Sequence, residues 1–214
     1  MKKGIIFDLD GTLWDSVATI TKAWNDVLLK DALIKSPLNT QKMMSMMGKT
    51  LPEFAAALLG DMPQEESLAV LGECCRRELI YIEKEGGELY EGVRETLKSL
   101  KKDYTLCIVS NCEDGYIQAF LKYYSLGELI DDFESFGTTG KDKDENILIV
   151  KERNGLDEAL YVGDTQKDCD CTHAAGLKFI HAAYGFGKVT NPDGVINSFG
   201  ELEKVVGGVF DLLK

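Results

Sequence analysis

Short apolar runs that favour β-strands alternate along the chain with segments whose apolar residues recur every three or four positions. The runs predict strands over 5–9, 104–110, 133–136, 159–162 and 178–182. The periodic segments predict helices over 93–102, 114–124, 146–154, 166–175 and 200–213. This alternation predicts an α/β fold in which helices cover both faces of a mainly parallel sheet. The strands are almost continuously apolar, as expected when both faces of a sheet are buried.

Residues 16–86 interrupt this alternation with a purely helical pattern. Apolar residues recur at helical spacing from Val17 to Val27 and again from Leu68 to Ile82, and Gly48 separates shorter helices between them. We therefore predict a core domain formed by 1–15 and 87–214, and a helical cap domain over 16–86. Ligands of open α/β sheets bind beyond the carboxyl ends of the strands, so a domain inserted after the first strand would cover the site as a lid.

The composition is that of a globular protein with an acidic surface. Of the 214 residues, 44% are apolar and 28% are charged, and the formal net charge is −12. This charge argues against a nucleic acid or an anionic membrane as a partner, because both require basic patches. A small phosphorylated substrate remains compatible, since a few local cations can hold it. No apolar run reaches the length of a membrane span or of a signal peptide, which favours a cytoplasmic location.

The cysteines do not indicate a disulfide framework. Two of the six, Cys74 and Cys75, are adjacent, and the others lie in predicted regular elements. The segment from Cys169 to His173 resembles a metal-ligand cluster, but no second cysteine or histidine pair stands at zinc-site spacing from it. We therefore interpret the six cysteines as free thiols.

The stretch "IIFDLDGTLWDS" places two carboxylates, Asp8 and Asp10, at the end of a strand that is expected to be buried. Burying an ionised carboxylate is costly unless it is paired, hydrogen-bonded or bound to a metal. Two neighbouring carboxylates also raise the pKa of each other. This arrangement indicates chemistry at the end of the first strand.

Polar residues follow the other predicted strands in the same way. Ser110 and Asn111 end the second strand, and Asp164 ends the fourth, with Asp168 four residues later. The loop "TGKDKDENI" adds lysines before the helix predicted at 146. Since the carboxyl ends of parallel strands share one edge of the sheet, we expect these groups to lie together. Oxygen ligands at this density favour Mg²⁺, and a lysine with a hydroxyl suits a phosphate.

These residues resemble the four motifs of the haloacid dehalogenase-like hydrolases. "DLDGT" at 8–12 is similar to the first motif, Ser110 to the second, a lysine of the loop to the third and "GDTQKD" at 163–168 to the fourth. The resemblance extends over essentially the whole chain, and the inserted helices resemble the family's α-helical cap. It implies a Rossmann-like, doubly wound parallel sheet with an inserted cap. The phosphoglycolate phosphatase-like enzymes are the most similar subgroup.

The resemblance also implies a role for each residue. Asp8 would be the nucleophile, forming an aspartyl-phosphate, and a Mg²⁺ ligand. Asp10 would be the general acid and base, with its backbone carbonyl on the metal. Asp164 would bind Mg²⁺, and Asp168 would bind it directly or support one of its ligands. Ser110, Asn111 and a lysine would hold the phosphoryl oxygens.

The motifs do not identify the phosphate-binding lysine uniquely, and they do not assign a lysine in the cap. The third motif lacks the prolines that usually follow its lysine, so Lys141 and Lys143 are both candidates, and the spacing to the following helix favours Lys141. In the cap, Lys49 stands between Gly48 and Pro52 and is a candidate for contacting an anionic leaving group; a solvated surface lysine is the alternative.

The predicted function is therefore a Mg²⁺-dependent phosphatase acting on a small, phosphoglycolate-like phosphorylated metabolite. A sugar phosphomutase of the same fold is an alternative, although the mutase-like members carry a cap histidine and residues 16–86 contain none. Asp10 argues against dehalogenase chemistry. A non-catalytic protein that binds phosphorylated metabolites is a further alternative, against which the complete set of motifs argues.

Overall fold

The computed structural model describes residues 1–30 and 33–212. Its main sheet has six strands in the order β5-β4-β1-β6-β7-β8, and every neighbouring pair is parallel. The strands are β1 (Lys3–Phe7), β4 (Thr105–Ser110), β5 (Asp132–Ser135), β6 (Glu158–Gly163), β7 (Lys178–Ala182) and β8 (Gly194–Ile196). The predicted Rossmann-like fold class is confirmed, and the strand that carries Asp8 lies near the centre of the sheet.

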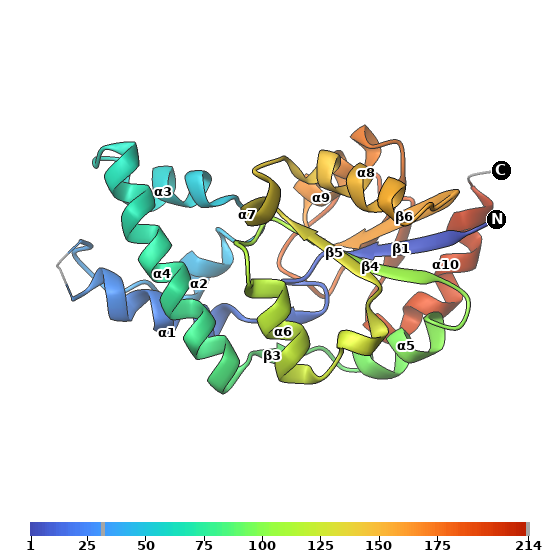
Figure 1. The fold of residues 1–214 in the computed structure, drawn as a ribbon, viewed down its shortest axis with the longest axis horizontal. Helices are drawn as coiled ribbons and strands as arrows, with labels where there is room; N and C mark the ends of the chain where they lie inside the picture. The colour runs from blue at the N-terminus through green and yellow to red at the C-terminus, as the bar shows by residue number, and fades with distance from the viewer. Residues whose placement is uncertain (31–32, 213–214) are drawn as a thin grey trace.

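Helices cover both faces of this sheet, as Figure 1 shows. The lower face is covered by α5 (Val93–Leu100), α6 (Tyr116–Tyr124) and α10 (Leu202–Asp211). The upper face is covered by α8 (Lys143–Arg153) and α9 (Gln166–Ala174). Alternate residues of each strand face the two layers: Ile5 and Phe7 join the lower core, and Ile6 joins the upper one. Burial on both faces explains why the strands are so apolar.

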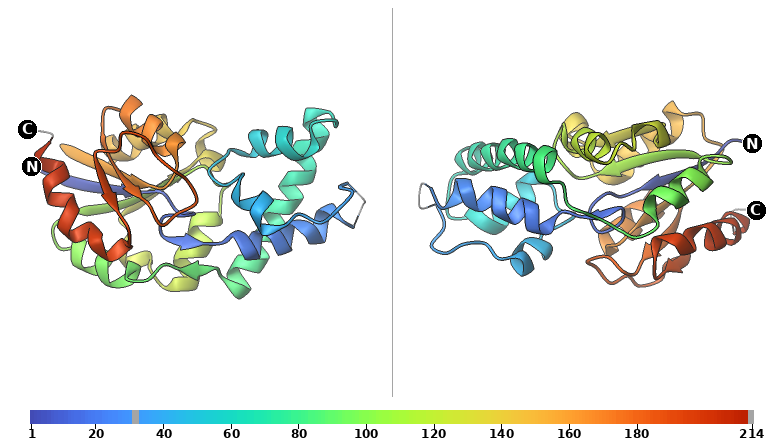
Figure 2. Two further views of the ribbon diagram at one scale, coloured as in Figure 1. Left: turned by 180° about the vertical axis from the view of Figure 1, so that it is seen from behind. Right: turned by 90° about the horizontal axis from the view of Figure 1, so that it is seen from below.

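Four helices form a separate lobe at one end of the molecule, opposite both termini (Figures 1 and 2). They are α1 (Val17–Leu28), α2 (Thr40–Met44), α3 (Leu51–Leu59) and α4 (Gln64–Glu85). The apolar stripes of α1 and α4 face each other, and Trp24 packs against Phe54 of α3 in a tilted arrangement with ring centroids 5.1 Å apart. Among the described residues of this lobe there is no strand. The lobe stands over the carboxyl ends of the central strands.

The two connections to this lobe pair with each other. β2 (Trp14–Asp15) and β3 (Glu88–Leu89) form a two-stranded antiparallel sheet that was not predicted. Gly87 allows this close approach, because a Cβ there would stand 2.6 Å from the backbone oxygen of Asp15. The exact boundaries of a cap at 15/16 and 86/87 stay a prediction.

Most predicted elements occur within a few residues of their expected bounds. The first strand ends at Phe7 rather than at residue 9, although the Asp8 amide still donates to the Val162 carbonyl at 2.8 Å. The last helix ends at Asp211, and the predicted end at 213 lies outside the described residues. Four short elements were missed, because a few residues do not establish a periodicity: β8, α7 (Phe136–Thr139) and the 3₁₀ turns at Gly127–Leu129 and Phe199–Glu201.

The part of the chain that the structure describes contains neither a disulfide nor a membrane-spanning helix. All six cysteines are free, as the sequence predicted. Within residues 1–30 and 33–212, no helix is long and apolar enough to cross a membrane.

Candidate active site

Three neighbouring strands place polar side chains at the sheet edge that faces the helical lobe. Asp8 directly follows β1, Ser110 is the last residue of β4, and Asp164 directly follows β6. All three residues are buried. The parallel order of these strands explains the convergence, since their carboxyl ends meet at one edge.

Gly11 lets the chain turn sharply after the two aspartates. Its φ is +81°, a left-handed conformation that disfavours other residues. A Cβ at this position would also stand 2.3 Å from Oδ2 of Asp164. Glycine is therefore required for both the turn and the close approach of the first and fourth motifs.

A buried lysine connects two of the carboxylates. Nζ of Lys143 lies 2.8 Å from Oδ1 of Asp8 and 2.5 Å from Oδ1 of Asp168. The Lys143 side chain is 1% exposed, and its ammonium also lies over the ring of Tyr161, 5.6 Å from the centroid. The two carboxylates raise the pKa of Lys143 well above its usual value, against the opposing effect of burial. Lys143 is therefore a fixed positive charge beside Asp8.

Lys141, which the spacing favoured, is not in this group. Its side chain is 49% exposed and stands 3.7 Å from Glu145. The difference arises because α8 begins at Lys143, three residues earlier than predicted. The side chain at the first helical position turns into the site, whereas Lys141 remains in the preceding loop.

We expect Lys143→Met to lower kcat/KM for a phosphate ester by about 100-fold, because a preorganised charge beside the reacting group is lost. Lys141→Met is the matched control and should change kcat/KM less than about three-fold, as for an exposed side chain with a weak ion pair. Steady-state kinetics on both purified variants measures this. Equal losses in the two variants would contradict the assignment of Lys143.

Asp10 points toward a different set of partners. Its Oδ1 accepts hydrogen bonds from Ser16 Oγ and from Tyr116 Oη, the latter at 2.8 Å. The hydroxyl oxygens of Tyr116 and Ser16 lie 3.0 Å apart. Burial raises the pKa of Asp10 to about 6, although these hydrogen bonds lower it. A carboxyl group with such a pKa can be protonated or ionised near neutral pH, which suits a general acid and base.

The carboxylates of Asp8, Asp164 and Asp168 lie close together at the sheet edge. One oxygen from each lies within 4.8 Å of the others. Oδ2 of Asp164 accepts from the Phe186 amide at 2.7 Å, whereas its Oδ1 is buried without a hydrogen-bond partner in the described part of the chain. Three buried carboxylates face one ammonium, so when all three are ionised two negative charges lack a counterion. An oxygen-only site with this charge fits a divalent cation such as Mg²⁺.

Asp168 is already satisfied on both oxygens. Oδ1 accepts from Lys143, and Oδ2 accepts from the backbone amide and hydroxyl of Thr165 at 3.0 and 2.6 Å. These contacts form a capping box at the start of α9 and keep the pKa of Asp168 below its usual value. Burial instead raises the pKa of Asp8 to about 7 and that of Asp164 to about 8. Asp164 and Asp8 are thus the carboxylates that most lack a cation.

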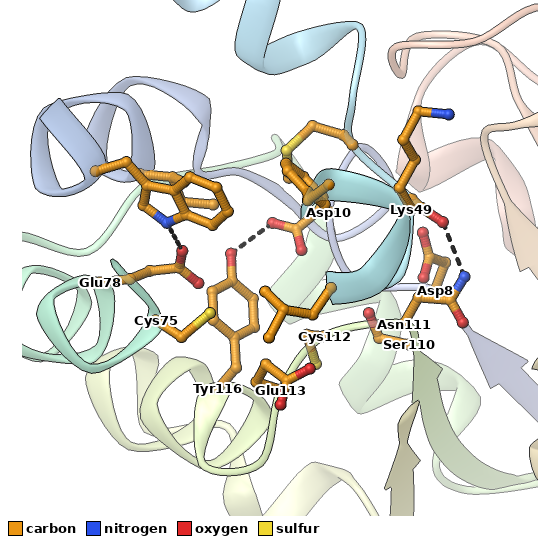
Figure 3. Close-up of a pocket in the computed structure, with 16 residues that line it drawn as sticks. Asp8, Asp10, Lys49, Cys75, Glu78, Ser110, Asn111, Cys112, Glu113 and Tyr116 are labelled. Atoms are coloured by element: carbon orange, nitrogen blue, oxygen red, sulfur yellow. Dashed lines mark hydrogen bonds between the residues drawn. The ribbon is translucent and has the colours of Figure 1, made fainter. Parts of the chain in front are cut away.

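A pocket opens from Asp8 and Asp10 between the sheet edge and the helical lobe (Figure 3). Ser110 and Asn111 line it on the core side. Nδ2 of Asn111 donates to the Gly48 carbonyl of the lobe at 2.8 Å, and its Oδ1 is buried without a partner among the described residues. Lys167 of the core also pairs with Glu53 of the lobe at 2.8 Å. In this structure Asn111 and the Lys167–Glu53 ion pair therefore both connect the lobe to the core.

Lys49 lies at the rim of the same pocket. It is exposed, and Figure 3 shows its ammonium directed away from Asp8 and Asp10. It makes no contact with the carboxylates of the site in this conformation. A role of Lys49 in substrate selection stays a prediction.

Three residues at the site were not anticipated: Ser16, Tyr116 and Glu78. Ser16 and Tyr116 hold Asp10, but an isolated hydroxyl in a sequence does not indicate such a contact. Glu78 lines the pocket, and its position in the sequence could have indicated an unusual role. It stands at the spacing of the apolar residues Leu71 and Ile82 on α4, where an acidic residue is unexpected.

Comparisons with known proteins agree with this geometry. Residues 5–182 match the protein family described as haloacid dehalogenase-like hydrolase. The chain is 28% identical over 220 residues to a phosphoglycolate phosphatase of Haemophilus influenzae, and this match covers 94% of the chain and 96% of the relative. Another phosphoglycolate phosphatase, from Shigella boydii, is 26% identical over 243 residues, covering 96% of the chain and 92% of that protein.

A solved structure with a similar fold is CbbY from Rhodobacter sphaeroides, a mutant in complex with xylulose-1,5-bisphosphate. It has a TM-score of 0.80 and 15% identity, and the match covers 94% of this chain and 96% of that one. Identity at this level establishes the similarity of the fold alone.

Proposed function

The chain belongs to the haloacid dehalogenase-like hydrolases and is a phosphatase, and from this premise we propose that it hydrolyses a small phosphorylated metabolite with Mg²⁺ through an aspartyl-phosphate. The observation that supports this most strongly is the environment of Asp8. This carboxylate is buried and lines the pocket, 2.8 Å from the ammonium of Lys143, with Asp10 two residues away. A nucleophile, a cation and an acid are then available to one phosphate.

Asp8 is the proposed nucleophile. Its carboxylate oxygen attacks phosphorus, and the bond from phosphorus to the ester oxygen breaks, which leaves the phosphoryl group on Asp8. Lys143 and the hydroxyl of Ser110 stabilise the negative phosphoryl oxygens. Water then attacks the same phosphorus, and inorganic phosphate leaves with regeneration of the carboxylate. Asn111 would join these donors only after releasing the Gly48 carbonyl.

Asp10 is the proposed proton donor and acceptor. It protonates the leaving oxygen in the first step and takes a proton from the attacking water in the second. Ser16 and Tyr116 hold its Oδ1, so the carboxyl group is oriented before substrate enters.

Mg²⁺ would be held by Asp8 and Asp164, with the Asp10 backbone carbonyl as a further proposed ligand, and it would neutralise negative charge on the phosphoryl group. Asp168 would act mainly by holding Lys143, because both of its oxygens are already hydrogen-bonded.

We expect Asp10→Asn to lower kcat for an alkyl phosphate by about 10²- to 10⁴-fold, since asparagine cannot donate a proton to the leaving oxygen. An aryl phosphate with an acidic phenol needs little protonation, so its rate of enzyme phosphorylation should fall much less. Rapid-quench measurement of the first turnover with both esters tests this. Equal losses with the two leaving groups would contradict the role of Asp10 as the acid.

Phosphoglycolate is the first substrate to test, because two relatives carry the name phosphoglycolate phosphatase. The decisive experiment measures phosphate release from a panel of phosphorylated metabolites with Mg²⁺. Net release identifies a phosphatase, whereas isomerised sugar phosphate without release identifies the mutase alternative. Lys49 remains the proposed cap residue for an anionic leaving group, which requires its side chain to turn inward.

Three further proposals concern the setting of this activity. The six free thiols support a cytoplasmic location. The net charge of −12 supports a small metabolite, rather than a nucleic acid or a membrane, as the partner. The four-helix lobe would act as the cap domain over 16–86, and the core would comprise 1–15 and 87–214.

A further inference from the structure

Helix α4 brings a carboxyl group into the pocket that the proposed reaction does not use. Glu78 is 8% exposed and lines the pocket together with Asp10 and Tyr116. Figure 3 shows Glu78 on the opposite side of the pocket from Asp8, with Tyr116 and Asp10 between them. This position corresponds to the part of a substrate that is distant from the phosphate.

Glu78 is held by only one hydrogen bond among the described residues. Nε1 of Trp24 donates to its Oε2 at 2.5 Å, and the other carboxyl oxygen has no donor from this part of the chain. Burial raises the pKa of Glu78 to about 8. A buried carboxyl group with an unused acceptor is stabilised by any ligand that supplies a donor there.

The remainder of the pocket does not favour an anionic leaving group. Its cap wall is apolar and comprises Ile20, Trp24, Met47, Leu51, Phe54 and Cys75. Besides Asp8 and Asp10, two further acids line it, Glu78 and Glu113. Lys49 is the single cation among the 16 lining residues that the structure describes, and its ammonium points outward. Once Glu78 is ionised, a substrate carboxylate near it would therefore meet negative charge without a compensating cation.

We propose that Glu78 is the specificity-determining residue of the pocket: it accepts a hydrogen bond from a hydroxyl or ammonium group of the leaving group and discriminates against a carboxylate there. This rests on the proposed phosphatase function, and it is an alternative to the proposed role of Lys49, because the two residues would select opposite kinds of leaving group. Specificity arises from two effects: a correct donor bonds the second Glu78 oxygen, and a carboxylate is repelled by the ionised group. The preferred substrates are then phosphate esters of polyols or amino alcohols rather than of hydroxy acids.

The test uses esters that differ only at the end distant from the phosphate. Glycerol 3-phosphate and 3-phosphoglycerate form one pair, and sorbitol 6-phosphate and 6-phosphogluconate form a longer one; each pair exchanges a CH₂OH group for a carboxylate. A glycerol 3-phosphate analogue with an ammonium in place of the terminal hydroxyl distinguishes the two donors. Assays are run over a series of pH values on both sides of the Glu78 pKa of about 8, and the ratio of kcat/KM within each pair is compared, because the ionisation of Asp10 affects both members of a pair alike.

For at least one pair, we expect kcat/KM of the native protein to favour the alcohol by about ten-fold or more, as for a charge-assisted hydrogen bond. Glu78→Gln keeps the acceptor for Trp24 but removes the charge, so the ratio within that pair should fall toward one. Glu66→Gln is the matched control, since Glu66 is an exposed residue of the same helix, and it should leave the ratio unchanged.

A preference of the native protein for both carboxylates, or a ratio that Glu78→Gln does not alter, would overturn the proposal. If Glu78→Gln does not fold, Trp24→Phe replaces it, because loss of the donor that fixes Glu78 should also reduce the ratio. Hydrolysis of para-nitrophenyl phosphate with Mg²⁺ tests the phosphatase function separately. Its absence would overturn both proposals, whereas a carboxylate preference that Lys49→Ala removes would overturn the role of Glu78 alone.

Discussion

Asp8→Asn is expected to lower phosphatase turnover by about five orders of magnitude, the scale seen when a nucleophile is removed. Asparagine has nearly the same shape as aspartate, but its amide cannot form the phosphoryl-enzyme. All steps of the proposed reaction pass through this carboxylate, so no other group at the site replaces it. The measurement is steady-state phosphate release, accompanied by mass spectrometry for a phosphorylated intermediate in the native protein.

The loss of activity at Asp8 should not be a loss of fold. Asp8, Asp164 and Asp168 place three carboxylates around the ammonium of Lys143. Without a metal, removing one negative charge reduces the repulsion, so the free energy of unfolding of Asp8→Asn should be equal to or higher than that of the native protein. Thermal denaturation in EDTA measures this.

The matched control is Asp170→Asn, the same substitution at an exposed position of α9. It should retain both turnover and stability. Turnover within ten-fold of the native rate in folded Asp8→Asn would exclude Asp8 as the nucleophile.

Chelation of divalent cations is the second change with a large expected effect. EDTA should reduce turnover to background, a fall of about 10⁴-fold or more, and Mg²⁺ should restore it, because the two uncompensated negative charges of the site otherwise repel the phosphate. Ca²⁺ should bind and restore little, since its looser coordination places the phosphate less well. Full turnover after exhaustive chelation would rule out this dependence.

A binding measurement separates metal affinity from catalysis. Mg²⁺ should raise the melting temperature of the native protein, since a ligand that binds only the folded state stabilises it. Asp164→Asn should abolish this shift, because Asp164 supplies the buried oxygen that lacks a partner among the described residues. A shift that persists unchanged in Asp164→Asn would place the cation elsewhere. The Asp170→Asn protein should show the native shift.

The fold class, and the convergence of several polar residues at one edge of the sheet, were predictable from local patterns. Strand–helix alternation predicted the parallel sheet, and the helical periodicity of 16–86 predicted the inserted lobe. Asp8, Ser110 and Asp164 could be expected to converge because each follows a strand, and strand ends of a parallel sheet share one edge. These predictions depend on residues that are close together in the chain, so they can be made from the sequence alone.

Other features of the site depended on the exact residue at which a helix begins, or on contacts between residues far apart in the chain. Lys143 lies beside Asp8 and Lys141 does not, because α8 starts at Lys143, and the spacing of apolar residues does not fix the first residue of a helix. Asn111 was expected to hold a phosphoryl oxygen, and the structure shows a further contact, since its Nδ2 donates to the Gly48 carbonyl of the lobe. Such a contact joins elements 63 residues apart.

The sequence by itself determined which chemical groups stand at the ends of the strands, and hence the family and the class of reaction. Only the tertiary structure decided how each group is charged and oriented: Lys143 between Asp8 and Asp168, and Asp10 held by Tyr116. It also decided that Glu78 enters the pocket. The physical reason is that pKa values and specificity depend on burial and on distances between residues remote in the chain, whereas strands and helices depend on residues close together in it.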